Sequence, residues 1–489
     1  MTPAPDLGQP TPHLQKTLTW KDGFALSIVS VNGLFVALGY AVGVLGAWTA
    51  IAIWVAATVI GLLQNRIFAE LASMFPGKSG GVARYAIEGW KRYFAPLGAI
   101  ASFGYWIGWS LSIAVTAAAL GGIIQAQWFA DSAWGIDFLG NPLGLGHVIA
   151  VVSIWAAWAV NYVGIHLAAT INKIVGIVVT VALVVVVVTA LAQGQWQGAN
   201  LTWGPGASFS AIIVWYYITA WTTYGVEIAA SFAPEYKDSV RDTAKALKAT
   251  STFMLIAFVA IPVGITGAIG EATLAENPVG YITVAFGNLF GGHGWIGSLV
   301  LVFSLWLAMV STTADGGRAL YGLAQEGMTI RQLDWLNRWG VPGRSLTLDA
   351  VINTAHILLL SSPVAILLAS NLGYMTAITL GVSAFLLLRK DRPNWPRPIR
   401  RSRIWVPTAA VIVAINVFVT IWGATHPSDA GYGGARETFI GLGILALSVV
   451  LFVYRQVIQD KRPIQWRDFS DDQPSAVETA PASNASPLP

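Results

Sequence analysis

The stretch Trp221-Thr-Thr-Tyr-Gly-Val-Glu227 lies in the middle of a long apolar block that begins near Phe209. It places two hydroxyls, a flexible glycine and a carboxyl where a spanning helix would cross the centre of a bilayer. A carboxyl at that depth costs about 2.5 to 3.5 kcal/mol or more, so it needs a compensating role. Hydrocarbon offers no hydrogen bonds to a freed backbone, so a break survives only where protein or a polar cavity satisfies it. The stretch therefore predicts an interrupted helix at a functional site.

The composition predicts that most of the chain lies in a membrane. The 489 residues are 55% hydrophobic and only 11% charged, and the mean hydropathy is +0.62, which is too apolar for a soluble multidomain protein. A spanning helix needs roughly 20 apolar residues. Twelve blocks meet this requirement, and they begin near Gly23, Ala47, Pro96, His147, Ala168, Phe209, Leu247, Trp295, Ser345, Pro363, Ile404 and Thr438.

The basic residues predict how the chain threads through the membrane. Of the 28 Lys and Arg residues, all but Arg66, Lys173 and Arg436 fall before the first block, after the last or in every second gap. Short loops rich in Lys and Arg stay on the cytoplasmic side during insertion. The alternation therefore predicts cytoplasmic termini and an even number of crossings. The polar N-terminus lacks the pattern of a signal peptide, which suits a bacterial inner membrane or a plasma membrane.

Three parts of the chain are expected to differ in character. Residues 1–19 form a cytoplasmic tail, residues 20–462 form the membrane domain, and residues 463–489 form a second cytoplasmic tail. The C-terminal tail is rich in Ser, Pro, Ala and acids, a composition that cannot bury a core, so we predict that it is disordered.

Several classes of chemistry have no support in the sequence. Without cysteine there is no disulfide, thiolate nucleophile or Cys-ligated metal, and the six histidines lack zinc-ligand spacing. No GxxxxGK[ST] loop and no nucleophile-base pair is evident. The pI is about 9.2, but the basic residues are spread over separate short loops. We therefore expect no cofactor, no metal, no enzymatic activity and no nucleic-acid partner; the lipid bilayer is the expected surrounding.

The first apolar block is also rich in small and polar residues: Ser27, Ser30, Asn32, Gly33, Gly39 and Gly43. It lies five blocks before the block that contains Glu227. An inverted repeat of five helices would give that spacing, with the leading helix of each repeat discontinuous and a binding site between the two. The alternative is that Gly and Ser only allow helices to pack closely.

Three stretches carry motifs of one family in matching order and spacing. They are Phe68-Ala-Glu-Leu-Ala-Ser-Met-Phe-Pro76, followed by Ser79-Gly-Gly81 and Tyr85; Trp221 to Asp238; and Gly317-Arg-Ala-Leu-Tyr321, followed by Glu326-Gly327. They resemble the second helix, the sixth helix with its following loop, and the end of the eighth helix of the amino acid-polyamine-organocation superfamily of permeases. The resemblance covers roughly residues 16 to 462.

The resemblance implies an all-α integral membrane protein with twelve transmembrane helices and a five-plus-five inverted repeat, in which helices 1 and 6 are discontinuous. It also implies a secondary-active permease that carries an amino acid, polyamine or other small amine by alternating access. Symport with a proton is the leading mode. Exchange of two organic solutes and symport with sodium are open alternatives, and the same scaffold could instead serve as a membrane sensor that binds without flux.

The resemblance also implies roles for particular residues. Trp221 matches an aromatic gate over the substrate, and Glu227 matches an acid that exchanges protons. Family members carry a Gly-Ser-Gly run in the first helix, and an ungapped match places Gly33-Leu34-Phe35 there, with Gly39 to Gly43 as the alternative break. The expected substrate-binding residues are Asn32, Gly33, Leu34, Phe35, Ser112, Trp221, Thr222, Thr223, Tyr224 and Gly225.

The eighth block supplies further candidates for coupling, Ser311, Thr312 and Asp315. Their oxygens suit a small hard cation. Alternatively, the hydroxyls bond to their own helix and Asp315 pairs with Arg318 one turn later. Arg66 and Glu70 are four residues apart in the second block, and we expect them to form a structural pair.

Overall fold

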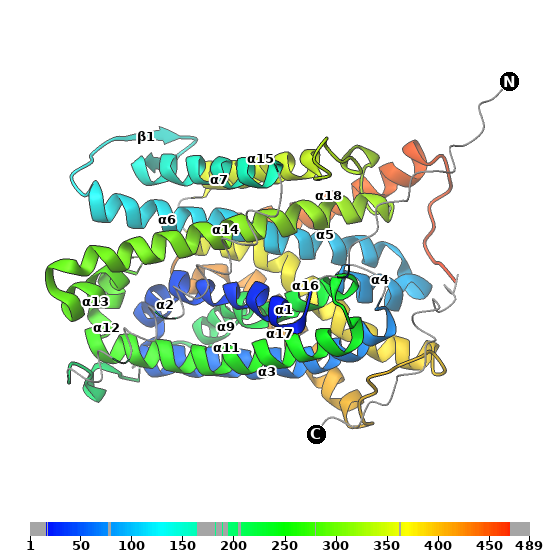
Figure 1. Cartoon of the computed structure of the whole chain (residues 1–489), viewed down its shortest axis with the longest axis horizontal. Coiled ribbons are helices and arrows are strands. Elements are labelled where there is room, and N and C mark those ends of the chain that lie inside the picture. Colours follow the sequence, from blue (N-terminus) through cyan, green and yellow to red (C-terminus); the bar gives the residue numbers. More distant parts are fainter. Residues whose placement is uncertain are drawn as a thin grey trace.

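The computed structural model describes residues 16, 18–76, 80–163, 181, 188, 194–203, 207–278, 280–360 and 363–469. Long helices run roughly side by side along the longest axis of the molecule (Figure 1). Within the described ranges, nine helical stretches are long and apolar enough to cross a membrane. The block expected near Ala168 falls outside the described residues, and two of the predicted spans are shorter helices. Twelve crossings therefore stay a prediction.

The helices of the first half follow the predicted blocks, with breaks inside two of them. In chain order these elements are α1 (Trp20–Ser27), η1 (Ile28–Val31), α2 (Asn32–Leu45), α3 (Ala47–Met74), α4 (Gly81–Phe94), α5 (Pro96–Ser110), α6 (Ser112–Trp128), β1 (Gly135–Phe138), β2 (Asn141–Gly144) and α7 (Leu145–Val163). The two strands pair antiparallel in a hairpin that the sequence analysis did not anticipate.

The second half contains one more interrupted helix and several short elements. In chain order they are η2 (Gly198–Asn200), α9 (Phe209–Tyr224), η3 (Gly225–Glu227), α10 (Ile228–Ser231), η4 (Ala233–Glu235), α11 (Ser239–Ile269), α12 (Glu271–Glu276), α13 (Tyr281–Phe290), η5 (Gly291–His293), α14 (Gly294–Gln325), η6 (Arg331–Leu333), α15 (Gly343–Leu359), α16 (Pro363–Asp391), α17 (Trp405–Thr425), η7 (Pro427–Ala430), α18 (Ala435–Tyr454) and η8 (Arg455–Gln459). The shorter spans are α9 with 16 residues and α15 with 17.

The predicted starts agree with the helices because local signals mark them. Proline occupies the first position of α5 and α16, where its missing N–H costs nothing. The Ser208 side chain caps α9 by accepting the Ala211 N–H at 3.1 Å. The largest error is at Leu247, because α11 begins eight residues earlier, where Asp238 caps a polar first turn.

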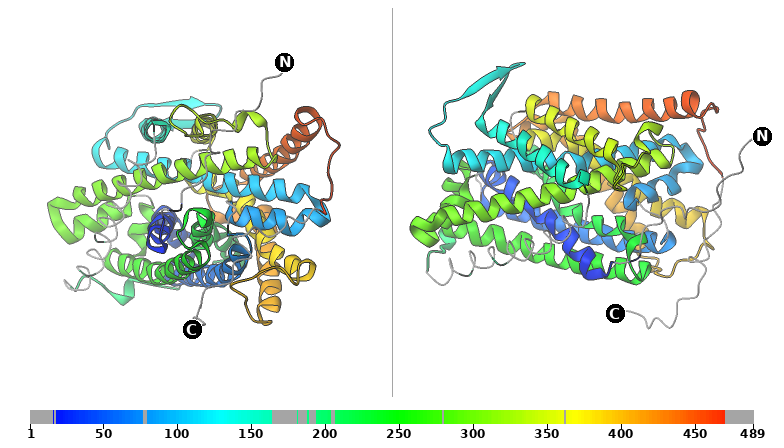
Figure 2. Two further views of the ribbon diagram at one scale, coloured as in Figure 1. Left: turned by 45° about the vertical axis from the view of Figure 1, so that its right-hand side comes forward. Right: turned by 45° about the horizontal axis from the view of Figure 1, so that its top comes forward.

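The segments that connect the long helices lie at two opposite ends of the bundle. The hairpin β1–β2 and helices α12 and α13 lie at one end, while α4 and the segment between α16 and α17 lie at the other (Figures 1 and 2). Between these ends, α1 and α2 run through the interior, with α14 on one side and α11 on the other (Figures 1 and 2). The interrupted first pair therefore lies inside the bundle.

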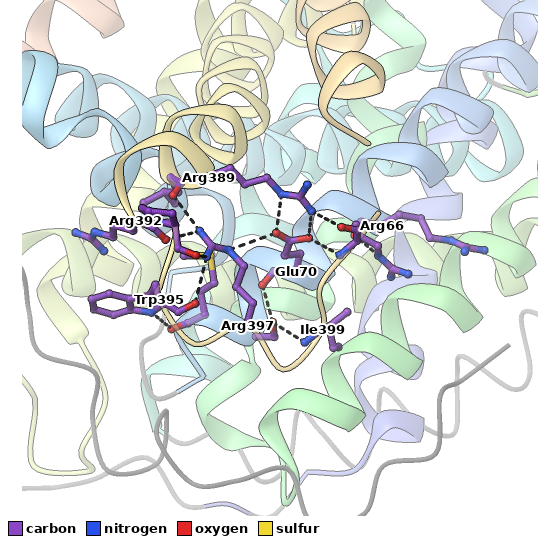
Figure 3. Close-up of polar contacts among 12 residues, drawn as sticks. Arg66, Glu70, Arg389, Arg392, Trp395, Arg397 and Ile399 are labelled. Carbon is purple, nitrogen blue, oxygen red and sulfur yellow. Dashed lines mark hydrogen bonds and ion pairs between the residues drawn. The ribbon is translucent and has the colours of Figure 1, made fainter. Parts of the chain in front are cut away.

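The end that carries α4 is held by a buried carboxylate, Glu70 of α3. Arg389 donates to both of its oxygens, at 3.0 and 2.7 Å, and the Arg401 backbone N–H donates at 2.7 Å. Arg397 lies 3.5 Å away as a further ion pair. Figure 3 shows Arg389 of α16 and Arg397 of the segment after it converging on Glu70. We call Glu70, Arg389, Arg397 and Arg401 the Glu70 cluster.

The predicted pairing of Glu70 with Arg66 is wrong. In the described part of the chain, Arg66 contributes its backbone carbonyl, which accepts the Arg401 Nε at 3.1 Å, and its guanidinium forms no ion pair with Glu70. Arg389, in the last turn of α16, supplies a stronger, bidentate partner, so the pair four residues away is displaced.

The segments that precede α1 and follow α18 both contact the helical bundle. The Leu18 N–H donates to the Glu235 carbonyl at 2.9 Å, and the Lys237 N–H donates back to Leu18 at 2.8 Å. Beyond α18, Trp466 stacks on Phe94 with ring centroids 5.8 Å apart. The first residues of the segment predicted as a disordered tail therefore contact α4, and residues 470–489 lie outside the described residues.

Candidate functional site

Two interrupted helices meet at the centre of the bundle. The first is interrupted by η1 and the second by η3, each a single turn of 3₁₀ helix between α-helical halves. The Ser30 hydroxyl lies 3.3 Å from the Gly225 carbonyl, and the Thr222 hydroxyl donates to the Ser30 carbonyl at 2.5 Å. The two breaks therefore contact each other, and the Gly225 break occurs where the sequence predicted it.

The first break lies before both predicted positions, about one turn before Gly33 and about three turns before Gly39. Gly33-Leu34-Phe35 and the Gly39 to Gly43 run are both inside α2. The interruption instead follows serines, because Ser27 donates to Gly23 at 2.8 Å and Ser30 donates to Ser27 at 3.0 Å. Serine hydroxyls that bond to nearby carbonyls compete with helix hydrogen bonds.

Gly33 and Gly225 are needed because the two helices approach closely. A Cβ at Gly33 would lie 2.5 Å from the Thr222 hydroxyl oxygen and 2.9 Å from the Trp221 ring. A Cβ at Gly225 would lie 2.7 Å from the Trp109 ring. Contacts this short require a shift of the neighbouring group, so only glycine fits this packing.

A pocket opens beside the two breaks, with about 660 Å³ of empty space that is partly continuous with solvent. Apolar groups form most of its wall, with hydroxyls and one carboxyl among them. The lining residues are Leu26, Ser30, Asn32, Gly33, Val36, Trp109, Ser112, Val115, Thr116, Trp221, Thr222, Ile228, Phe232, Ala308, Ser311, Thr312 and Asp315. A mostly apolar pocket with a few convergent polar groups is typical of a small-molecule site.

Two tryptophans in this wall are anchored reciprocally. Trp221 of α9 donates from its indole Nε1 to the Gly108 carbonyl of α5 at 2.8 Å. Trp109 of α5 donates from its Nε1 to Glu227 at 3.2 Å. Their ring centroids lie 5.9 Å apart. Each ring is therefore fixed by the helix that carries the other.

Glu227 lies behind Trp109 and does not line the pocket. Its side chain is fully buried, and the Tyr374 hydroxyl of α16 donates to the same carboxyl oxygen as Trp109, at 3.0 Å. The other oxygen, Oε2, has no hydrogen-bond partner among the described residues. Glu227 thus has neutral donors only, an unusual state for a buried carboxyl.

The structure divides the predicted site residues into two groups. Those that line the pocket are Asn32, Gly33, Ser112, Trp221, Thr222, Ser311, Thr312 and Asp315. Those that do not are Leu34, Phe35, Thr223, Tyr224, Gly225 and Glu227.

The second group packs into the protein. The Tyr224 hydroxyl donates to Asn416 of α17 at 3.1 Å, and the Phe35 carbonyl accepts the Tyr281 hydroxyl at 3.1 Å. Thr223 donates to the Thr219 carbonyl at 3.0 Å. These residues therefore support the wall rather than face the cavity.

The eighth-block candidates match the second predicted arrangement only in part. Thr312 donates to the Ala308 carbonyl of its own helix. Asp315 lines the pocket, but no ion pair with Arg318 forms within the described structure; Arg318 instead donates to Ala314 at 3.2 Å. No cluster of three or more His, Cys, Asp or Glu residues that could hold a metal occurs among the described residues.

Sequence reasoning missed a third break, between α5 and α6 at Leu111. Asn353 of α15 accepts the Ala114 N–H at 3.0 Å and donates to the Ser110 hydroxyl at 3.1 Å, and Ser110 donates in turn to Asp349. This buried polar group fixes the turn that carries Trp109 and Ser112. The signal in the sequence was the repeat of polar residues at four-residue spacing on α15, Ser345, Asp349 and Asn353.

A helical membrane bundle with a pocket of a few convergent polar groups beside two interrupted helices is typical of a solute transporter. The chain matches the family model for amino acid permeases over residues 18–451, and it belongs to that family. Its relatives are transporters, not enzymes. This chain is therefore a multi-pass membrane transporter of amino acids or amines.

Three curated relatives illustrate the breadth of the family. The chain is 23% identical to the amino-acid permease RocE of Bacillus subtilis over 413 residues, 77% of this chain and 82% of RocE. It is 22% identical to the D-serine/D-alanine/glycine transporter of Escherichia coli over 355 residues, 68% and 72% of the two chains. It is 23% identical to the polyamine transporter PUT1 of Oryza sativa over 504 residues, 99% and 87% of the two chains.

Proposed function

We propose that this protein is a secondary-active permease that moves a small nitrogen-containing solute by alternating access, through a twelve-helix, five-plus-five inverted repeat. The observation that carries the proposal is the pocket at the contact of η1 and η3. Interrupted helices leave backbone groups near a cavity, and rocking of the two repeats would expose that cavity to each side in turn. Trp221, which lines the pocket, is the gate, and Thr222 and Asn32 supply hydrogen bonds to the solute.

Uptake in this proposal is coupled to a proton through Glu227. The carboxyl is buried at membrane depth and receives neutral donors only, so gain or loss of a proton changes its interactions strongly. Trp109 contacts Glu227 on one side and the pocket on the other, which links protonation to solute occupancy. Ser311, Thr312 and Asp315 face the same cavity, and sodium symport or solute exchange would use them instead.

Reconstitution tests the proposal directly. Purified protein in proteoliposomes would be given radiolabelled amino acids, polyamines and amines under a pH gradient, a sodium gradient or an internal solute. We expect uptake driven by the pH gradient, and we expect Glu227→Gln to lose the pH dependence while keeping solute binding. Unchanged pH dependence in Glu227→Gln would remove the coupling role, and binding without flux would favour a sensor.

We further propose that both termini lie in the cytoplasm and that the protein resides in a bacterial inner membrane or a plasma membrane. The alternation of Lys- and Arg-rich gaps supports this orientation. Single cysteines introduced into this cysteine-free chain, one in α4 and one in the β1–β2 hairpin, would be probed with an impermeant thiol reagent in intact cells. Labelling of the hairpin cysteine alone agrees with the proposal, and labelling of the α4 cysteine alone reverses it.

A further inference from the structure

The described pocket wall carries a negative charge and no positive charge. Asp315 is the only charged residue among those that line the pocket in the described structure, and the lining contains no Lys, Arg or His. A second carboxyl, Glu227, lies directly behind the wall, bonded to Trp109. A cation that enters this pocket meets the Asp315 carboxyl, whereas an anion meets no opposite charge in the described wall.

The surroundings of Asp315 do not neutralise it with an ion pair. The charged groups that act on it are Arg318, one turn along α14, Glu235 of η4 and Asp349 of α15. Arg318 bonds to the Ala314 carbonyl and forms no ion pair with Asp315 in the described structure. Among these groups only Arg318 is a cation, and it also acts on Glu235, so the negative charges outnumber it and Asp315 can accept a bound cation.

The break where a substrate carboxylate could be held is crowded. Helix N-termini at breaks hold anions through bare backbone N–H groups. Here the Cα of Gly33 packs against Thr222 and Trp221, since an added Cβ would meet the Thr222 Cβ at 2.7 Å and the Trp221 ring at 2.9 Å. The break itself is a closed 3₁₀ turn whose last residue, Val31, has helical backbone angles.

The rest of the wall suits an apolar chain that ends in an ammonium group. Trp109 and Trp221 present two anchored indole rings, and an organic cation is attracted to the face of an indole. Val36, Val115 and Ile228 supply aliphatic contacts in the same pocket. These groups offer no specific partner to a carboxylate.

We infer that the cargo is a small organic amine without a carboxylate, whose ammonium group lies against Asp315 and whose carbon chain lies along Trp109 and Trp221. The inference rests on the proposed function, because it takes this pocket as the transport site. Within that function it selects amines over amino acids. An amino acid of the same side chain would bury its carboxylate without an opposite charge in the described pocket wall, which costs affinity.

The test uses pairs of compounds that differ only in the α-carboxyl group. Proteoliposomes with the full chain would be assayed with isopentylamine against leucine, phenethylamine against phenylalanine and cadaverine against lysine. We expect the amine of a transported pair to have an apparent affinity at least about tenfold higher, the change expected from one unpaired buried charge. Equal affinity, or preference for the amino acid, would overturn the inference and leave the proposed permease intact.

A variant then assigns the counter-ion. Asp315→Asn should lower the affinity for the amine by about tenfold or more and reduce its advantage over the amino acid. Asp137→Asn, in the exposed hairpin outside the pocket, is the matched control and should leave both unchanged. An unaltered preference in Asp315→Asn would overturn the role of Asp315. If no compound of any pair is bound or moved, the proposed function itself fails.

Discussion

Glu70 and Glu227 are both fully buried, but the protein surrounds them in opposite ways. Glu70 receives a bidentate guanidinium, a second guanidinium and a backbone N–H, so both of its oxygens are bonded. Glu227 receives an indole and a phenol on one oxygen, and the other has no partner among the described residues. The first arrangement holds the end of the bundle together, and the second leaves a carboxyl whose state can change.

The difference separates stabilising from functional carboxyls. A buried charge with opposite charges around it is costly to disturb, because removal of one partner strands the others. A buried carboxyl with neutral partners can gain a proton without breaking an ion pair. The Glu70 cluster therefore lies at the end of the bundle that carries α4, and Glu227, the carboxyl with neutral partners, lies behind the pocket wall beside the interrupted helices.

Replacing each of the two glutamates by glutamine, in separate variants, should give the largest difference in the free energy of unfolding. Glu70→Gln leaves Arg389 and Arg397 without a carboxylate, and we expect a loss of about 3 to 5 kcal/mol in the free energy of unfolding. Glu227→Gln keeps an acceptor for Trp109 and Tyr374, so its loss should stay within about 1 kcal/mol. Thermal unfolding of the purified variants in detergent would measure both. Equal losses would show that the two sites do not differ as described.

The second largest loss of stability is expected when the contact between the interrupted helices is crowded. Gly33→Ala places a methyl group against Thr222 and Trp221, and we expect a loss of about 1 to 3 kcal/mol together with impaired solute binding. Gly322→Ala, also inside a long helix, meets nothing within 4 Å and should be neutral or stabilising by up to about 1 kcal/mol. A Gly33→Ala protein as stable and active as Gly322→Ala would show that the contact seen here is not required.

The sequence predicted what depends on local signals and missed what depends on distant partners. Apolar length located α3, α5 and α16 at their first residue, and the break at Gly225 was visible in the motif around it. Trp109 was missed because its direction depends on the turn at Leu111, which α15 supports from far along the chain. Glu70 was assigned the wrong partner for the same reason, since Arg389 follows it by 319 residues.

Two serine-to-alanine substitutions would test whether α15 supports the pocket wall. Ser110→Ala removes the hydroxyl that joins Asp349 to Asn353, and we expect a loss of about 1 to 2 kcal/mol. Ser448→Ala removes a buried hydroxyl that bonds only to its own helix, at Leu445, and should cost less.

The reactivity of a thiol in the pocket wall would show whether Ser110→Ala also changes the pocket. Thr116→Cys supplies a unique thiol in the pocket wall of a chain that has no cysteine. Its rate of reaction with a small methanethiosulfonate should change several-fold in Ser110→Ala, and it should not change in Ser448→Ala. Identical rates in both variants would mean that α15 does not position the wall.

The smallest loss of stability is expected for an exposed ion pair, and the contribution of this pair should depend on pH. Arg331 is 58% exposed and lies 2.8 Å from Asp460. Slight burial raises the pKa of Asp460, but hydrogen bonds from Arg331 and Arg455 outweigh it and hold the pKa below its ordinary value of 3.8. Because a carboxyl with a depressed pKa stabilises the fold above its unfolded pKa, this contribution is present at neutral pH and is lost as the pH falls through the folded value. Arg331→Gln should therefore cost less than about 1 kcal/mol at pH 7, since solvent screens exposed pairs. Thermal unfolding of Arg331→Gln and the parent protein should differ at pH 7 and converge once the pH is low enough to protonate Asp460 in the folded protein. A gap that persists in acid would mean that Arg331 contributes through packing rather than charge.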